Sequence, residues 1–239
     1  MQRVLVLGCC ALLWGCADEG PSAYADFNLV PNAECIYDPE GDVVFYGEGY
    51  YDIAVAGAPE AAEERGCAHS YVLNLRVNSG LRSNVDEDLG RAEPNVLQVT
   101  EVEVHLYNLQ RERLDFGEGL PNPFRVVATI SLEPAASTGE PARGVAKVEV
   151  IPTSYGEALT GFVGSQILVE ARLYGRTLGD VEVAFKPYIY PVRICMGCFS
   201  LCLNRDILDN GMTAEDVLES DVCQDGAGAD GRICIDPNC

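Results

Sequence analysis

The sequence has few of the residues and motifs by which enzymes are usually recognised. It holds two histidines, His69 and His105, and neither has a nucleophile in a recognisable motif beside it. There is no P-loop, no glycine-rich dinucleotide fingerprint after a strand and no HExxH zinc motif. The segment around Ser165 lacks the flanking glycine of a nucleophile elbow. These absences favour a non-catalytic protein, and we expect no catalytic residue, no cofactor and no resident metal.

Basic residues are also scarce. The chain has 16 Lys and Arg residues against 37 Asp and Glu residues, which gives a net charge of −21. Nucleic acid is a polyanion and would be repelled, so nucleic acid is excluded as a partner. The many carboxylates leave one enzyme class open as an alternative, a secreted hydrolase that works with two acidic residues on a β-sandwich. The large number of acidic residues does not by itself identify which two would form such a catalytic pair.

Long hydrophobic runs are missing apart from residues 4–14, which follow Arg3. This run is shorter than the roughly 18–20 residues of a membrane-spanning helix, and it has the length of a signal-peptide core. It runs into Leu13-Trp14-Gly15-Cys16, in which Leu13, Gly15 and Cys16 occupy the aliphatic, small and cysteine positions of a lipobox. The N-terminus therefore resembles the signal of bacterial lipoproteins.

This resemblance implies that residues 1–15 are removed and that Cys16 is acylated. Two or more acyl chains hold a protein stably on a bilayer, so the expected membrane contact is a lipid anchor without a spanning segment. Ala17, where an aspartate would imply inner-membrane retention, implies the outer membrane, on its periplasmic or surface face. The alternative is an ordinary secretory signal and a soluble periplasmic or secreted protein. Composition and layout resemble envelope lipoproteins of high-GC, myxobacteria-like bacteria, a resemblance that implies no activity.

The chain has 11 cysteines, of which Cys9 and Cys10 leave with the signal and Cys16 carries the lipid. The others form an even set, which in an exported protein indicates a disulfide framework. These disulfide candidates are Cys35, Cys67, Cys195, Cys198, Cys202, Cys223, Cys234 and Cys239. The simplest partition is a Cys35–Cys67 bridge and three bridges within the tail, whose pairing the sequence leaves open.

The spacing Cys195-x-x-Cys198-x-x-x-Cys202 has two alternative interpretations. Zinc and iron–sulfur sites use cysteines this close together, but no histidine lies nearby. A thioredoxin-type CxxC sits at a strand-to-helix turn of a βαβ unit, and no such pattern surrounds this one. A structural role for these cysteines is favoured, with a metal or redox site in the cluster as the alternative.

The middle of the chain alternates apolar and polar residues with a period of two, as antiparallel strands do when one face is buried. The apolar sets are Tyr71, Leu73, Leu75, Val77; Val102, Val104, Leu106; Phe124, Val126, Ala128, Ile130, Leu132; Ile167, Val169, Ala171, Leu173; and Val181, Val183, Phe185. About eight or nine such strands predict an all-β fold, an antiparallel β-sandwich of immunoglobulin-like architecture, with a closed barrel as the alternative. The only tryptophan lies in the signal, so the core signature of a true immunoglobulin domain is absent.

We expect a signal peptide at 1–15, an N-terminal tether and first strand region at 16–41, a β-sandwich domain at 42–193 and a cysteine-rich C-terminal tail at 194–239. Short helices are predicted near 59–66 and 213–220. The expected function is a structural or binding role at the cell envelope, with an envelope protein as a candidate partner. Five tyrosines could present an aromatic platform to a ligand, but packing within strands is the favoured role, and the lack of tryptophan beyond the signal disfavours sugar stacking. These tyrosines are Tyr46, Tyr50, Tyr51, Tyr188 and Tyr190.

Overall fold

The computed structural model describes residues 22–32, 36–41, 43–53, 70–83, 93–135, 139–198, 200–202 and 234–236. Cys16, Cys35, Cys67, Cys223 and Cys239 lie outside these residues, as do the two predicted helices, and Cys202 and Cys234 are described by their backbone alone. Within the described part of the chain, no helix has the length and apolar character needed to cross a membrane.

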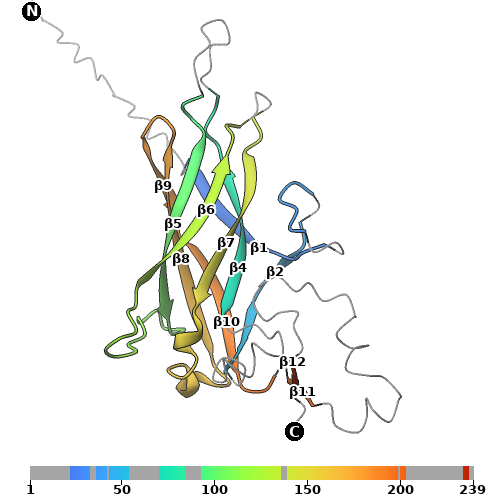
Figure 1. The fold of residues 1–239 in the computed structure, drawn as a ribbon, viewed down its shortest axis with the longest axis vertical. Helices are drawn as coiled ribbons and strands as arrows, with labels where there is room; N and C mark the ends of the chain where they lie inside the picture. The colour runs from blue at the N-terminus through green and yellow to red at the C-terminus, as the bar shows by residue number, and fades with distance from the viewer. Residues whose placement is uncertain are drawn as a thin grey trace, which may run out of the picture.

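The fold is all-β, as the sequence predicted, with two layers of strands facing each other across one core (Figure 1). The described strands are β1 Ala23–Leu29, β2 Phe45–Tyr46, β3 Gly49–Asp52, β4 Tyr71–Ser79, β5 Leu97–Tyr107, β6 Phe124–Leu132, β7 Ala142–Ile151, β8 Gln166–Thr177, β9 Glu182–Lys186, β10 Tyr188–Cys195, β11 Ser200–Cys202 and β12 Cys234–Asp236. Two short 3₁₀ turns, Thr153–Tyr155 and Thr160–Phe162, connect β7 to β8.

The first layer has the strand order β2-β1-β4-β7, and all its pairs are antiparallel. The second layer has the order β3-β10-β8-β5-β6 and is antiparallel except for the parallel pair β3–β10. Strand β9 pairs antiparallel with β8 and parallel with β1, so it joins the two layers along one side. Since β1 is a full member of the first layer, the sandwich includes a strand from the 16–41 region.

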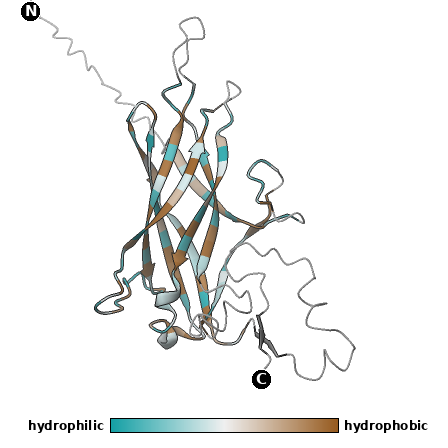
Figure 2. Cartoon of the chain, in the orientation of Figure 1, coloured by the Kyte–Doolittle hydropathy of each residue, from teal (hydrophilic) through white to brown (hydrophobic). Residues whose placement is uncertain are grey.

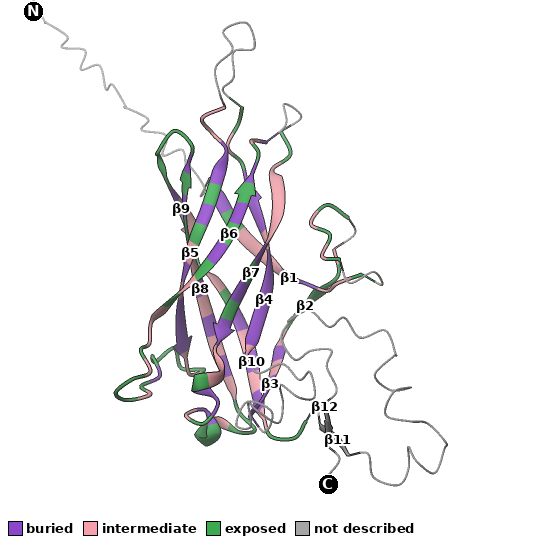
Figure 3. Cartoon of the chain, in the orientation of Figure 1, coloured by how far each residue is buried: buried purple, intermediate pink, exposed green. Residues whose placement is uncertain are grey.

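The predicted alternation is visible along β5, β6 and β8 as stripes of hydropathy and burial (Figures 2 and 3). In β6, for example, Ala128, Ile130 and Leu132 are buried and the residues between them are exposed. Strand β4 differs, because Asn74 and Asn78 on its predicted polar face are also buried. Asn28 of the neighbouring strand β1 is buried as well, and its side-chain oxygen accepts a hydrogen bond from the backbone N–H of Asn74.

The core contains a group of tyrosines where β3, β4 and β10 meet. The ring of Tyr71 lies 6.4 Å from Tyr190, whose ring stacks in turn on Tyr188 at 6.2 Å. Tyr51 and Tyr190 are each 2% exposed, and burial raises the pKa of the Tyr51 hydroxyl. Tyr188 and Tyr190 share a face as expected, but this face points inward. Tyr51 and Tyr190 therefore have the packing role that the sequence favoured, and the alternative of an exposed platform does not apply to them.

Candidate functional site

The outer face of the second layer carries a network of charged side chains. Residues that alternate with the core positions of β5, β6, β8 and β10 point outward on this face. Within it, Arg125 of β6 pairs with Glu101 at 2.7 Å and Glu103 at 3.1 Å. On β8, Arg172 pairs with Glu170 at 2.6 Å. Cross-strand neighbours of opposite charge stabilise the sheet and orient one another.

Glu103 lies at the centre of this network. One carboxylate oxygen is 2.8 Å from Nε2 of His105, and the other accepts hydrogen bonds from Arg125. The hydrogen bond with His105, followed by that with Arg125, lowers the pKa of the Glu103 carboxyl below its ordinary value. The carboxylate is therefore held in its charged form, as an acceptor and not as an acid.

His105 occupies the predicted polar face of its strand, but it is only 7% exposed. Its ring lies parallel to that of Tyr107, with the centroids 5.9 Å apart. Nε2 faces Glu103, whereas Nδ1 is buried without a hydrogen-bond partner among the described residues. Among the described residues, no hydroxyl or thiol is hydrogen-bonded to either nitrogen, and the contacts of the ring are with Glu103 and Tyr107.

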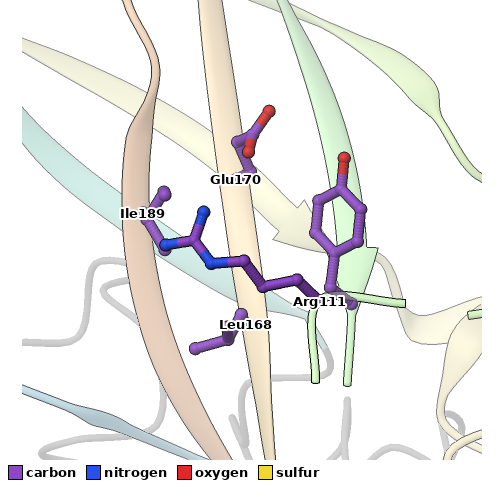
Figure 4. Close-up of a pocket in the computed structure, with 5 residues that line it drawn as sticks. Arg111, Leu168, Glu170 and Ile189 are labelled. Atoms are coloured by element: carbon purple, nitrogen blue, oxygen red, sulfur yellow. The ribbon is translucent and has the colours of Figure 1, made fainter. Parts of the chain in front are cut away.

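A pocket of about 180 Å³ opens on the same face, between β5, β8 and β10 and the loop after β5. It is lined by Tyr107, Arg111, Leu168, Glu170 and Ile189. Figure 4 shows the Arg111 side chain lying across the pocket, with its guanidinium between Glu170 and Leu168 and close to Ile189. The pocket thus offers an aliphatic surface, an aromatic ring and two opposite charges within one small space.

The loop after β5 places Arg111 over the sheet. The side-chain oxygen of Asn108 accepts backbone hydrogen bonds from Gln110 and Glu112, each 2.9 Å long, which closes a tight turn. Arg111 takes a left-handed backbone conformation in this turn, with φ of 62°. The turn directs Arg111 back toward β8, while Tyr107 and Arg113 form a bridge at its base.

Arg111 differs from most other described arginines in its partners. Six of them form ion pairs with carboxylates: Arg76, Arg125, Arg143, Arg172, Arg176 and Arg193. Arg111 makes no ion pair within the described part of the chain, although Glu170 lines the same pocket. Glu170 is instead held by Arg172. The pocket therefore contains a guanidinium whose hydrogen-bonding capacity is open to a ligand.

A second pocket, of about 440 Å³, lies within the long β5–β6 loop and includes Asp115 and Asn122 in its wall. The Asn122 side chain bonds the backbone N–H and carbonyl of Leu106 and the carbonyl of Leu114. Its polar groups are used to hold the loop together. Neither pocket is lined by two carboxylates, which is the arrangement that the hydrolase alternative requires.

A separate group forms where β10 ends beside β3. Cys195 and Cys198 are joined by a disulfide, with their Cα atoms 5.9 Å apart. In the parallel β3–β10 ladder Cys195 is the register partner of Asp52, which is only 3% exposed. A carboxylate oxygen of Asp52 accepts a 2.7 Å hydrogen bond from the backbone N–H of Gly197, within the Cys-x-x-Cys loop.

The carboxylate and the two sulfur atoms of this group lie within 4.8 Å of one another. This spacing could suit a metal ion, but sulfurs that are bonded to each other offer no thiolate to a metal. This bridge joins two of the predicted disulfide candidates, and it lies at the start of the cysteine-rich region. The chemistry available to the group in this state is thiol–disulfide exchange.

The cysteines of this group are recognisable in the sequence, whereas its carboxylate is not. Asp52 follows two tyrosines in a short strand, and no motif connects it with Cys195. Arg111 was missed for a similar reason, because one arginine in a polar turn has no distinguishing signal. His105 was noted as a polar-face residue, and its contact with Glu103 two positions earlier follows from strand periodicity.

Comparison of the chain with other proteins adds no relative to this description. No protein-family model matches the sequence, and no curated protein is significantly similar to it.

Proposed function

We propose that this protein is an exported, lipid-anchored component of the cell envelope that binds another protein through the pocket around Arg111. The anchor is inferred from the lipobox-like segment that ends at Cys16. The binding role is inferred from a single feature of the sandwich, a guanidinium without an ion pair in a pocket that also has apolar walls.

The size of the pocket favours a protein partner over a small molecule. Sites for drug-sized ligands or cofactors usually enclose about 300–1,000 Å³. This pocket encloses about 180 Å³, which accommodates one side chain of a partner. Arginine and tyrosine are the residue types that most often dominate protein–protein binding energy, and Arg111 and Tyr107 supply both here.

Charge indicates the chemistry of the partner segment. The chain carries a net charge of −21, yet Arg111, Arg125, Arg172 and Arg193 lie on or over this one face. All but Arg111 are paired with acidic neighbours. A partner that supplies a carboxylate to Arg111 and an aliphatic side chain to Leu168 and Ile189 satisfies the pocket. Val127 and Tyr174 are exposed on the same face, and the charged side chains of Glu170 and Arg172 separate Tyr174 from Leu168 along β8.

Photo-cross-linking in intact cells tests the binding role. A photoreactive phenylalanine replaces Ile189 in the full-length protein, and covalent adducts are identified by mass spectrometry. We expect one discrete adduct with an envelope protein, lost when Arg111→Glu is added. The matched control, Arg113→Glu, makes the same charge change two residues away and should keep the adduct. Adducts that are equally abundant with both variants would overturn the proposed site.

The anchor is tested separately by intact mass spectrometry of the protein extracted from membranes. We expect an N-terminal Cys16 that carries acyl chains, and release of the Cys16→Ser variant into the soluble fraction. If Cys16 is unmodified and the protein is found in the soluble fraction, the lipid anchor is refuted and the alternative of an ordinary secretory signal holds.

A further inference from the structure

We propose that the Cys195–Cys198 disulfide is redox-active and exchanges with cysteine pairs of other exported proteins. The proposal concerns the end of β10 and does not depend on the binding pocket. It rests on four observations about this bridge, namely its span, the support of its loop, the unequal exposure of its sulfurs and the carboxylate beside them.

The span of the bridge suits exchange better than structural stabilisation. A disulfide stabilises a fold mainly by restricting the unfolded chain, and the effect increases with the length of the closed loop. Cys195 and Cys198 are three positions apart, so their bridge closes a very short loop. Other interactions also hold this region in place. The backbone N–H of Gly197 donates a hydrogen bond to Asp52, and residues 192–195 of β10 pair with β3. The bridge can therefore open without unfolding the sandwich.

The two sulfur-bearing residues differ in exposure. Cys198 is exposed, whereas Cys195 lies within β10 and is only partly exposed. An incoming thiolate therefore reaches Cys198 first, and Cys195 is the leaving group. The sulfur of Cys195 lies 3.6 Å from the backbone oxygen of Tyr51. Once reduced, the Cys195 thiol has this oxygen as a hydrogen-bond acceptor.

Asp52 is the positioning residue of the site. Its buried carboxylate holds the loop through Gly197 and lies within 4.8 Å of both sulfurs. The protonated carboxyl of Asp52 can give its proton to Cys195 as that sulfur leaves, and the resulting carboxylate can take the proton back when the bridge re-forms.

The exchange is balanced as a two-electron reaction. The thiolate of a partner dithiol attacks Sγ of Cys198, the Cys195–Cys198 bond breaks, and Cys195 leaves as a thiolate that takes up a proton. The second partner thiol then attacks the mixed disulfide and releases Cys198. The partner loses two electrons and two protons and becomes a disulfide, while Cys195 and Cys198 become thiols. The reverse sequence, driven by a partner disulfide, re-forms the bridge.

Selective reduction provides the first test. The full-length exported protein is incubated natively with reduced and oxidised glutathione, alkylated and digested, and the tryptic peptide 194–205 is followed by mass spectrometry. We expect Cys195 and Cys198 to be reduced at least tenfold faster than the other disulfides and to re-oxidise when oxidised glutathione is restored. A pair that resists reduction until the protein is denatured would overturn the proposal.

Single-cysteine variants distinguish attack at Cys198 from general reactivity. Cys195→Ser leaves Cys198 as an exposed thiol, and we expect it to accumulate a mixed disulfide with glutathione. Cys198→Ser is the matched control, and its partly exposed Cys195 should react at least tenfold more slowly. Equal reactivity of the two variants would contradict the assigned roles.

Asp52→Asn tests the carboxylate while keeping an acceptor for the Gly197 N–H. We expect exchange at neutral pH to slow by about tenfold or more, with a changed pH profile, because an amide cannot transfer the proton. If Asp52 only shapes the loop, the rate and its pH profile will match those of the unmodified protein, and the proposed proton transfer by Asp52 is then refuted. The binding assay on Arg111 is unaffected by either result.

Discussion

The carboxylate of Asp52 accepts a hydrogen bond from the backbone N–H of Gly197, 145 residues further along the chain, at 2.7 Å. This contact links the end of β3 to the loop after β10 and lies at a buried position. It brings together two segments that no local pattern relates. We expect it to stabilise the oxidised protein whether or not the disulfide is redox-active.

The first prediction concerns this contact. Asp52→Ala should lower the free energy of unfolding by about 1.5–3 kcal/mol, the usual range for a hydrogen bond to a charged group. Asp52→Asn should lower it by less, because the amide oxygen can still accept from Gly197. Urea unfolding of the oxidised proteins measures both values. Equal losses in the two variants would show that the charge, and not the hydrogen bond, is responsible.

The second prediction concerns the close approach of β3 to the tyrosine core. A Cβ atom at Gly49 would collide with the hydroxyl of Tyr71 and lie 3.0 Å from the ring of Tyr190. Gly49→Ala should therefore destabilise the fold by about 1–3 kcal/mol through overpacking. Gly47→Ala is the matched control, since a Cβ there has nothing within 4 Å. Thermal or urea unfolding of the two variants should differ clearly, and similar stabilities would contradict the packing argument.

The third prediction is a pH dependence. The hydrogen bonds from His105 and Arg125 lower the pKa of Glu103 in the folded protein, so folding favours its charged form. This contribution to stability is present above the ordinary glutamate pKa of about 4.3 and is lost as the pH falls through the lower folded value. Glu103→Gln should therefore reduce stability at pH 6–7 and converge with the unmodified protein in strong acid.

Urea midpoints measured between about pH 2 and pH 7 check this convergence. Glu118→Gln serves as the control, because Glu118 is an exposed loop residue without an ion pair among the described residues. A constant stability difference between Glu103→Gln and the unmodified protein at every pH would contradict the prediction.

The fourth prediction concerns the β5–β6 loop. Asn122 makes one hydrogen bond to the backbone N–H of Leu106 and donates to the carbonyls of Leu106 and Leu114. Asn122→Ala should lower the free energy of unfolding by about 1.5–4.5 kcal/mol, on the basis of roughly 0.5–1.5 kcal/mol for each of the three bonds. Asn122→Asp keeps the acceptor but loses both donors, so it should also destabilise. Urea unfolding reports the cost, and amide hydrogen exchange at Leu106 reports whether the loop opens.

The period-two pattern located several strands and their inward faces, because side chains alternate strictly along extended backbone. It also placed Tyr188 and Tyr190 on one face. It could not decide whether that face points to solvent or to the core, since tyrosine is compatible with both. The contact with Tyr71 decided this, and it depends on which strands become neighbours.

The net charge by itself predicted that nucleic acid is not a partner, which stays a prediction. The local order of residues determined the β-rich fold and the closeness of Cys195 and Cys198. The first depends on total charge, the β-rich fold on the period of two along each strand, and the closeness of the two cysteines on their separation of three positions. Only the tertiary structure placed Asp52 beside the cysteines, through the parallel β3–β10 pairing, and Arg111 over Leu168, through the turn after β5. Both arrangements join distant segments, and pairing between such segments is set by how the whole core packs.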